Sequence, residues 1–299
     1  MIDVICNPVA GPKRGNRIDR VRDSLSSRGA AFRLRETGGP GDAVLMAREA
    51  AHSGAETVVA VGGDGTLNEV ANGLAGSVTR MAAVPVGTGN VFAKEFSLPP
   101  TVEGCLALLD EGKTVSVPLA KANDRYFVLL ASAGFDAEVV ERMTHLQKNA
   151  LGISAYVLVG MRHILRPQPT LWAEFPDRER IEAQSVIVVR GRKYGGGVTI
   201  APAADIAGNT FQVILLLRKG RWAIAKFALD ILRGRHGASP HVMVREAPSL
   251  VVRCRIPSAA QVDGDFLGSL PVRFSVTDVR LRIVVPKEFP APGGADNRR

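Results

Sequence analysis

The sequence predicts an α/β N-terminal domain with a parallel sheet, followed by a C-terminal antiparallel β-sandwich domain. Up to about residue 120, short apolar runs alternate with segments of helical periodicity, which is typical of parallel strands covered by helices. After that point strand-like segments dominate, and turn signals such as Asn123-Asp124 separate them, which favours an antiparallel sandwich. We therefore expect domains over residues 1–118 and 119–289, and a frayed Pro/Gly-rich tail over residues 290–299.

In the N-terminal domain, the pattern predicts strands that each lead into a helix. The strands are short apolar or β-branched runs: Asp3–Cys6, Ala31–Arg35, Thr57–Val61 and Met81–Val86. Capping residues and apolar spacing predict helices that begin at Asn16 or cover Asp42–Ser53, Leu67–Leu74 and Val91–Phe96. The carboxyl ends of parallel strands share one edge of a sheet, and ligands of open α/β sheets bind there.

In the C-terminal domain, alternating apolar patterns predict many short strands: Tyr126–Ala131, Leu171–Phe175, Ser185–Arg190, Phe211–Leu217, Val242–Arg245, Leu250–Ile256, Val272–Val276 and Arg280–Val285. Two helical stretches interrupt them. The first covers Ala137–Lys148 and runs on towards Arg166, and the second covers Arg221–Leu232.

Composition excludes several classes of protein. Of the 299 residues, 46% are hydrophobic and 22% are charged, which excludes a long disordered chain. The net charge of +9 favours an anionic partner, but aromatic residues make up only 5%, so we expect no nucleic acid partner. The sequence contains no apolar run long enough to span a membrane and no basic leader before an apolar run, so we expect a cytoplasmic protein.

Glycine-rich turns follow three of the predicted strands. They are Asn7-Pro8-Val9-Ala10-Gly11, Gly62-Gly63-Asp64-Gly65-Thr66 and Gly87-Thr88-Gly89-Asn90. Glycine lets the backbone turn sharply and bring its N–H groups close to an anion, and a following helix N-terminus adds positive charge. Such turns at one edge of a sheet indicate a nucleotide-phosphate cleft rather than ordinary loops.

Two groups of carboxylates are open to more than one interpretation. Asp64 repels phosphate, so it either caps the helix that follows or lies beside a metal ion or a donor hydroxyl. Far downstream, Asp263-Gly264-Asp265 is either a surface turn or a functional pair, in which one carboxylate is a general base and the other holds a metal or orients the base.

Taken in order, these motifs resemble those of the diacylglycerol kinase catalytic-domain family, which includes bacterial lipid kinases, sphingosine kinases and ceramide kinases. The matching motifs are Asn-Pro-x-Ala-Gly from Asn7, Gly-Gly-Asp-Gly-Thr with Asn68-Glu69-Val70, Pro85-x-Gly-Thr-Gly-Asn90, Ala133–Asp136, Tyr194–Gly197 and Asp263-Gly264-Asp265. The resemblance spans about residues 2–285. It implies an NAD kinase/diacylglycerol kinase-like fold and a cleft between the two domains where ATP meets a lipid hydroxyl.

The resemblance also implies roles for particular residues. It places the phosphates of ATP on the loop Gly62, Gly63, Asp64, Gly65 and Thr66, with Asn7, Thr37, Gly87, Thr88, Gly89 and Asn90 lining the same cleft. It makes Asp263 the base that takes the hydroxyl proton, with Asp64 as the rival candidate, and it implies Mg²⁺ held with the help of Asp64 and Asp265.

This chain departs from the family pattern at two positions. Asp265 stands where the family usually has Glu, so the charge is kept but the side chain is one methylene shorter. Gly208-Asn209 stands where bacterial relatives commonly have Asp-Gly, and those relatives use that Asp in a secondary structural Mg²⁺ site. We therefore expect this second site to be absent or altered here, because Gly208 supplies no oxygen ligand from its side chain.

The implied activity is ATP-dependent phosphorylation of a lipid alcohol such as diacylglycerol, a sphingoid base or ceramide. The nearest enzymatic alternative is an NAD kinase-like protein, against which Gly87-Thr88-Gly89-Asn90 argues. A non-catalytic lipid-binding or regulatory protein that retains the cleft is the third possibility. Asp64 and Asp263 argue against it, and Gly208-Asn209 is the feature in its favour.

A lipid substrate requires contact with a membrane, and the segment over residues 218–235 is the candidate for it. Ile224, Phe227, Ala228, Ile231 and Leu232 share one helical face, and cations cluster at both ends of the helix. Either this stripe packs onto the sandwich, or the helix meets anionic headgroups through Trp222 and its cations. We expect peripheral association with an anionic membrane surface.

Overall fold

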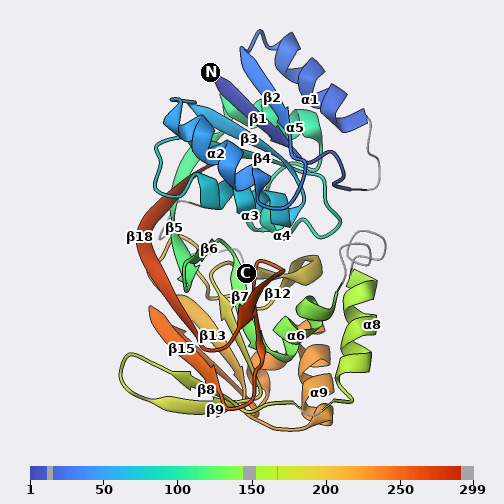
Figure 1. Cartoon of the computed structure of the whole chain (residues 1–299), viewed down its shortest axis with the longest axis vertical. Coiled ribbons are helices and arrows are strands. Elements are labelled where there is room, and N and C mark those ends of the chain that lie inside the picture. The colour runs from blue at the N-terminus through green and yellow to red at the C-terminus, as the bar shows by residue number, and fades with distance from the viewer. Residues whose placement is uncertain (12–15, 144–152, 167, 291–299) are drawn as a thin grey trace. The chain divides into compact units, whose positions relative to one another are not determined.

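The computed structural model describes residues 1–11, 16–143, 153–166 and 168–290, and it divides into two compact units (Figure 1). The first unit comprises Met1–Leu119 together with the C-terminal segment that begins at Asp278. The second unit comprises Ala120–Thr277. The chain passes from one unit to the other within two strands, β5 (Lys113–Ala122) and β18 (Val272–Val285).

The first unit is the predicted α/β domain with a parallel sheet, which confirms that part of the fold class. Its strands lie in the order β2-β1-β3-β4, and the C-terminal part of β18 pairs with β4 in the same parallel sense. Besides β5 and β18, its elements in chain order are β1 (Ile2–Cys6), α1 (Asn16–Ser27), β2 (Phe32–Glu36), α2 (Asp42–His52), β3 (Thr57–Gly62), α3 (Asp64–Gly73), β4 (Arg80–Pro85), α4 (Val91–Glu95) and α5 (Val102–Glu111).

Helices cover both faces of this sheet. Helix α1 packs with α5, and α2 packs with α3. The connection from β1 through α1 to β2 runs away from β3, and the connection from β2 through α2 to β3 runs in the opposite direction. Because such connections are right-handed, the pair α1 and α5 lies on one face of the sheet and the pair α2 and α3 on the other. All six residues of β3 are buried, as expected for a central strand with helices on both sides.

The second unit is the predicted antiparallel β-sandwich. Besides its parts of β5 and β18, its elements are β6 (Arg125–Phe127), β7 (Leu130–Gly134), α6 (Phe135–Arg142), α8 (Ile153–His163), β8 (Leu171–Glu174), β9 (Arg180–Ala183), β10 (Ser185–Val189), β11 (Lys193–Tyr194), β12 (Val198–Thr199), β13 (Phe211–Leu216), α9 (Arg221–Leu232), β14 (Val242–Ala247), β15 (Ser249–Cys254), β16 (Ala259–Val262) and β17 (Asp265–Ser269).

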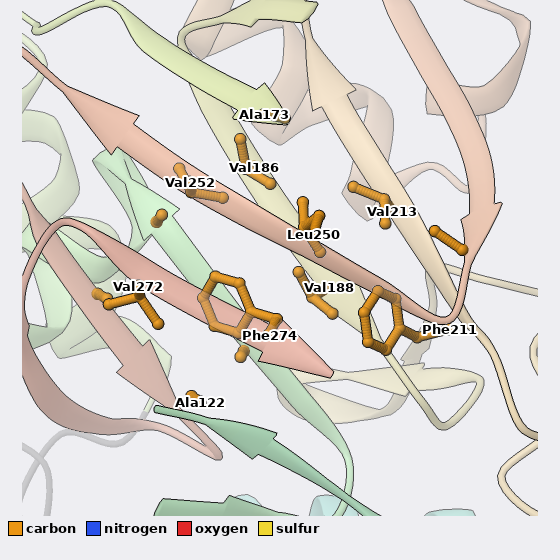
Figure 2. Packing of buried hydrophobic residues seen from close by; sticks show 14 of the residues in the cluster. Ala122, Ala173, Val186, Val188, Phe211, Val213, Leu250, Val252, Val272 and Phe274 are labelled. Atoms are coloured by element: carbon orange, nitrogen blue, oxygen red, sulfur yellow. The ribbon is translucent and has the colours of Figure 1, made fainter. Parts of the chain in front are cut away.

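The sandwich core lies between two antiparallel layers of this unit. One layer has the strand order β14-β13-β10-β7-β16-β17, and in the other β15 pairs with both β18 and β8, while β8 pairs with β9. Figure 2 shows side chains of the first layer, such as Val186 and Val213, facing those of the second, such as Leu250 and Phe274. The ring of Phe274 also meets Phe127 edge to face, with the ring centroids 6.4 Å apart.

The structure differs from the sequence prediction in several places. The predicted strands Val272–Val276 and Arg280–Val285 are parts of one strand, β18, and its end belongs to the first unit because Arg282 and Ile283 pair with β4. The sequence predicted a second domain over residues 119–289, whereas the second compact unit of the structure ends at Thr277. The hairpin β16–β17 was not predicted as strands. The predicted helix end at Lys148 and the tail after Pro290 lie outside the described residues.

Candidate functional site

The register of the parallel sheet brings the predicted nucleotide-binding loops to one edge. Cys6, the last residue of β1, pairs with Glu36 of β2 and with Val61 of β3, while Gly62 pairs with Pro85 of β4. The residues that follow these strand ends, Asn7, Thr37, Gly63 and Val86, therefore lie along one edge. The backbone N–H groups of three of them donate across the sheet: Asn7 to Val61 O at 2.9 Å, Thr37 to Cys6 O at 2.9 Å and Val86 to Gly62 O at 2.8 Å.

Two glycines of these loops leave room for atoms that approach them closely. A Cβ atom on Gly62 would lie 2.4 Å from Cβ of Thr66, and one on Gly87 would lie 2.9 Å from Cα of Gly63. Both distances are too short for a real side chain, so positions 62 and 87 have room only for glycine. Gly63 differs from them, since its φ of −83° is ordinary and an added Cβ would meet Gly87 at 3.6 Å.

Asn7 links the first loop to the second. Its Nδ2 donates to Oγ1 of Thr66 at 3.1 Å, and its Oδ1 accepts from the N–H of Val9 at 3.1 Å. The amide side chain thus fixes both the turn after β1 and the first turn of α3. Thr37 lies at the same edge and is half-buried.

Asp64 connects the second loop to the third. Its carboxylate oxygens accept from the N–H groups of Val91 at 3.1 Å and Phe92 at 3.0 Å, which are the first residues of α4. Burial raises the pKa of Asp64, although these N–H groups and Lys94 act in the opposite direction. Of the two interpretations that the sequence left open, the structure favours a cap, but for α4 rather than for the helix that contains Asp64.

A cavity of about 230 Å³ opens beside the third loop, lined in part by Arg17, Gly87 and Asn90. Asn90 has a left-handed backbone conformation with φ of 47°, and among the described residues its buried Oδ1 has no hydrogen-bond partner. Arg17 donates to the carbonyl oxygen of Val86 at 2.7 Å and presents positive charge at this edge. Sequence reasoning missed Arg17, and a cation in the helix that follows the first loop was the available signal.

In the second unit, the Asp263-Gly264 pair forms the turn of the β16–β17 hairpin. Both residues have positive φ, 46° and 87°, which is the geometry of a tight two-residue hairpin turn. The Asp263 carboxylate accepts from the N–H of Val128 at 2.8 Å and from those of Leu129 and Leu130 at 2.9 Å each. Asp263 thereby fastens the hairpin to the start of β7.

A buried polar network also supports this hairpin. Asp136, on α6, accepts hydrogen bonds from Ser132, from the Tyr194 hydroxyl and from Gln261 Nε2, the last at 3.1 Å. The Oε1 atom of Gln261 in turn accepts from the N–H of Gly264 at 2.9 Å. Burial raises the pKa of Asp136. Asp136 and Tyr194 come from two separate family motifs, and the fold joins them.

Asp265 has a different environment from Asp263. Its Oδ2 lies 3.0 Å from Nη2 of Arg125, and the side chains of both residues are 32% exposed. Arg125 was not predicted, because no motif near it indicated a functional residue. Asp265 therefore presents a carboxylate that solvent can reach.

Within each unit, the described carboxylates do not form a protein cage for a metal ion. Among the residues that the structure describes, no group of three or more His, Cys, Asp and Glu side chains converges. The oxygens of Asp64 accept backbone hydrogen bonds, and Asp265 pairs with Arg125, so neither fits a preformed Mg²⁺ site built from protein ligands alone.

The loop over residues 205–210 is held by an arginine. The side chain of Arg190 is fully buried and donates to the carbonyl oxygens of Ile206, at 2.7 Å, and Thr210. Asp205 accepts from the N–H of Ala207 at 2.9 Å, so its carboxylate closes its own turn. Gly208 packs against Asp205, and an added Cβ would lie 3.3 Å from the Asp205 carbonyl oxygen.

Comparison with known proteins gives matches over nearly the whole chain. The sequence pattern of the diacylglycerol kinase catalytic domain matches residues 2–122, and that of the YegS C-terminal NAD kinase beta sandwich-like domain matches residues 130–285. A diacylglycerol kinase of Staphylococcus epidermidis (strain ATCC 12228) is 27% identical over 290 residues, which cover 95% of this chain and 92% of the relative. One of Staphylococcus aureus (strain MRSA252) is 26% identical over 292 residues, with 96% and 92% covered.

Solved structures have the same fold. A diacylglycerol kinase from Bacillus anthracis str. Sterne aligns with a TM-score of 0.73 at 18% identity and covers 97% of this chain and 98% of its own. Another structure from the same organism aligns with a TM-score of 0.80 at 20% identity, with the same coverage.

Proposed function

Because the chain belongs to the diacylglycerol kinase family, we propose that it transfers the γ-phosphoryl group of ATP to a hydroxyl group of a membrane lipid, with diacylglycerol as the first candidate. The observation that carries the proposal is the alignment of the loops after β1, β2, β3 and β4 along one sheet edge. Backbone N–H groups of glycine-rich loops are suited to phosphate, since no side chain blocks the approach.

On this proposal, ATP binds at the strand-end loops of the first unit. The phosphates lie over Gly62–Thr66, and the unpartnered Oδ1 of Asn90 supplies an acceptor for a donor group of the nucleotide. Arg17 contributes positive charge beside them. Asn7, Thr37 and Asp64 hold the loops in place rather than contribute to the reaction itself.

The proposed reaction would take its magnesium ion together with the nucleotide. Mg²⁺ keeps several water ligands in kinases and is commonly bound by phosphates with one or two carboxylates, and when bound it neutralises the charge of the transferred group. On this proposal the phosphates of the nucleotide would hold most of the ion, because Asp64 already accepts from two backbone N–H groups and Asp265 lies beside Arg125.

For the base we propose Asp265 in place of the predicted Asp263. The three N–H donors to Asp263 occupy its carboxylate, and moving it would release the hairpin turn. Asp265 follows directly in β17 and is partly exposed, with Arg125 to orient it. The lipid hydroxyl oxygen then attacks the γ-phosphorus, the bond to the bridging oxygen breaks, ADP leaves, and the hydroxyl proton passes to the Asp265 carboxylate.

Incubation with labelled ATP and a membrane lipid extract tests the activity, and NAD in place of the lipid tests the NAD kinase alternative. We expect label to be transferred from ATP to a lipid and not to NAD. For the base, we expect Asp265→Asn to lower kcat about 10²-fold or more without changing nucleotide affinity. Asp265→Glu restores the usual family residue and is expected to keep turnover.

Asp263→Asn serves as the matched comparison. We expect it to lower the free energy of unfolding, because an amide cannot accept from all three N–H groups, and to lower turnover only as far as the hairpin is disturbed. If Asp263→Asn loses turnover with unchanged unfolding while Asp265→Asn remains active, the base is Asp263 after all.

A further inference from the structure

Helix α9 is apolar on two opposite faces. Ile224, Phe227 and Ile231 are buried against the sandwich, as one of the two sequence interpretations expected. The predicted stripe does not hold for Ala228 and Leu232, which are both exposed. Leu232 is 59% exposed and lies on the outward face with Trp222, which is 78% exposed. Trp222, Leu229 and Leu232 follow helical spacing on that face.

Helix α8 and the turn after it expose a second apolar stripe. Leu158, Met161 and Leu165 follow one another at helical spacing and point outward, with Met161 65% and Leu165 72% exposed. The neighbouring Ile164 packs against the same buried cluster that receives Phe227. The end of α8 and the helix α9 are thus neighbours in the second unit, as Figure 1 also shows.

Arginines surround these apolar side chains. Residues 218–238 contain six lysines and arginines and a single acid, Asp230, which accepts from Lys226. Exposed arginines lie on both stripes, and within the described part of the chain the following have no ion-pair partner: Arg162, Arg166, Arg221, Arg233 and Arg235. The outward face of α8 and α9 therefore combines a large apolar area with uncompensated positive charge.

We propose that this outward face docks the enzyme on an anionic lipid bilayer. The proposal rests on the proposed function, since a lipid acceptor lies in a bilayer that the enzyme has to reach. Tryptophan prefers the membrane–water interface, leucine and methionine side chains enter the acyl boundary, and arginines meet anionic headgroups.

The charge pattern favours a bilayer over other occupants. A second copy of this chain on the same face would bring the two sets of arginines together, which is unfavourable without acids to pair with them. Nucleic acid would satisfy the arginines, but it would leave Leu165, Met161 and Leu232 against a polar backbone. An anionic bilayer satisfies both components at once.

Direct contacts tie the docking face to the hairpin that carries Asp265. Helix α6 contacts α8 and also the strands β16 and β17. Within these contacts, the Glu138 carboxylate accepts from Ser258 at 2.7 Å, just before β16, and lies 2.5 Å from Nε2 of His163 at the end of α8. A bilayer bound at α8 and α9 is thus connected to the proposed acceptor side of the same unit.

Tryptophan fluorescence provides the first test, because the chain contains only Trp172 and Trp222. In the full-length Trp172→Phe variant, Trp222 is the sole reporter. We expect its emission to shift to shorter wavelength with vesicles that contain phosphatidylglycerol, to be quenched by brominated acyl chains, and to stay unchanged with pure phosphatidylcholine. Vesicle binding without any change in Trp222 emission would overturn the proposal.

Substitutions provide the second test, by vesicle sedimentation without nucleotide. We expect Trp222→Ser/Leu232→Ser and, separately, Arg233→Gln/Arg235→Gln each to weaken partitioning onto anionic vesicles about tenfold or more. Raised salt should weaken partitioning of the wild type as the arginine substitutions do, because it screens charge but does not affect the apolar side chains in this way. The matched controls are Leu45→Ser and Arg48→Gln on α2, since Leu45 is 64% exposed and Arg48 is also exposed. Equal losses in the controls would contradict the assignment of the face.

A short-chain, soluble acceptor separates this inference from the proposed function. The docking variants are expected to keep wild-type turnover on it and to lose turnover only on vesicle substrate. If the wild type binds vesicles through Trp222 but phosphorylates no lipid, the proposed function fails and the docking face stands. If light scattering shows a lipid-free dimer that Trp222→Ser dissociates, the face is a self-association surface and the docking proposal is wrong.

Discussion

Asp64 in the first unit and Asp263 in the second both belong to a motif of glycines and carboxylates, and both accept hydrogen bonds from consecutive backbone N–H groups. Asp64 accepts from Val91 and Phe92 at the start of α4, in the next strand-to-helix loop along the sheet. Asp263 accepts from Val128 to Leu130, which are more than 130 positions away in sequence.

The two sites nevertheless differ in the contacts that stabilise them. The strand-end loops of the first unit depend on close packing, because Gly62 leaves room for Thr66 and Gly87 leaves room for the backbone of Gly63. The β16–β17 hairpin depends on buried polar side chains, Asp136 and Gln261 among them. A site of the first kind is sensitive to added volume, and a site of the second kind is sensitive to lost hydrogen bonds and to backbone conformation.

Alanine at Gly62 and at Gly264 tests this contrast with the largest expected effect. Gly62→Ala is expected to lower the free energy of unfolding by about 1–3 kcal/mol, because the new Cβ would collide with Thr66 at 2.4 Å. Gly264→Ala is expected to cost about 1–2 kcal/mol for a different reason, since an added Cβ has nothing within 4 Å but φ is 87°. Urea unfolding with an unchanged m-value measures both.

Gly264→Asn and Gly63→Val sharpen the result. Asparagine tolerates positive φ, so Gly264→Asn should be less destabilising than Gly264→Ala, and an equal loss would mean that space also matters at the hairpin. Gly63→Val is expected to fold, since its φ is ordinary, but to lose ATP binding by blocking the phosphates. Normal ATP affinity of this variant by calorimetry would remove the phosphate-loop assignment.

This contrast also explains what the sequence could predict. The loops after β1, β3 and β4 are local features, since a β-branched run, a glycine turn and a helix start stand together in the chain, and they were predicted within a few residues. The positions of Arg17 beside Asn90 and of Arg125 beside Asp265 depend on the tertiary fold. A cation in the helix after the first loop was the available local signal for Arg17, and no local pattern indicated Arg125.

The hairpin β16–β17 was missed although the chain carried a signal for it. Asp263-Gly264 is a preferred pair for a two-residue hairpin turn. The strand before it has no polar–apolar alternation, because all four residues of Ala259–Val262 are buried, and Gln261 is buried in a polar network. The roles of the two carboxylates likewise depend on N–H donors from a remote segment, which the motif alone does not reveal.

The pH dependence of stability is expected to have opposite signs at two carboxylates, one in each unit. Burial raises the pKa of Asp64 above 3.8, so its contribution to stability is complete below that value and is lost as the pH rises through the folded-state pKa. Burial also acts to raise the pKa of Glu138, but His163 and Ser258 hold it below 4.5. Its contribution is complete above 4.5 and is lost as the pH falls through the folded-state pKa.

Urea unfolding of Asp64→Asn and Glu138→Gln at a series of acid pH values tests these signs. The stability of the wild type relative to Asp64→Asn should fall as the pH rises, and its stability relative to Glu138→Gln should fall as the pH decreases. If the difference in unfolding free energy between wild type and variant changes with pH in the same direction for both variants, the opposite pKa shifts of the two carboxylates are wrong.

Mg²⁺ gives the smallest expected effect on stability. We expect it to stabilise the first unit only when ATP is bound and not to stabilise the second unit. The charged side chain of Arg190 donates to the carbonyl oxygens of Ile206 and Thr210 and would repel a cation at this loop. The Asp205 carboxylate accepts from the N–H of Ala207 in its own turn. Without nucleotide, we expect the same urea midpoint in Mg²⁺ as in EDTA. With ATP, we expect Mg²⁺ to raise the midpoint, because the nucleotide that carries it binds only the folded first unit. A rise without ATP that Asp205→Asn abolishes would instead place a metal site at residues 205–210.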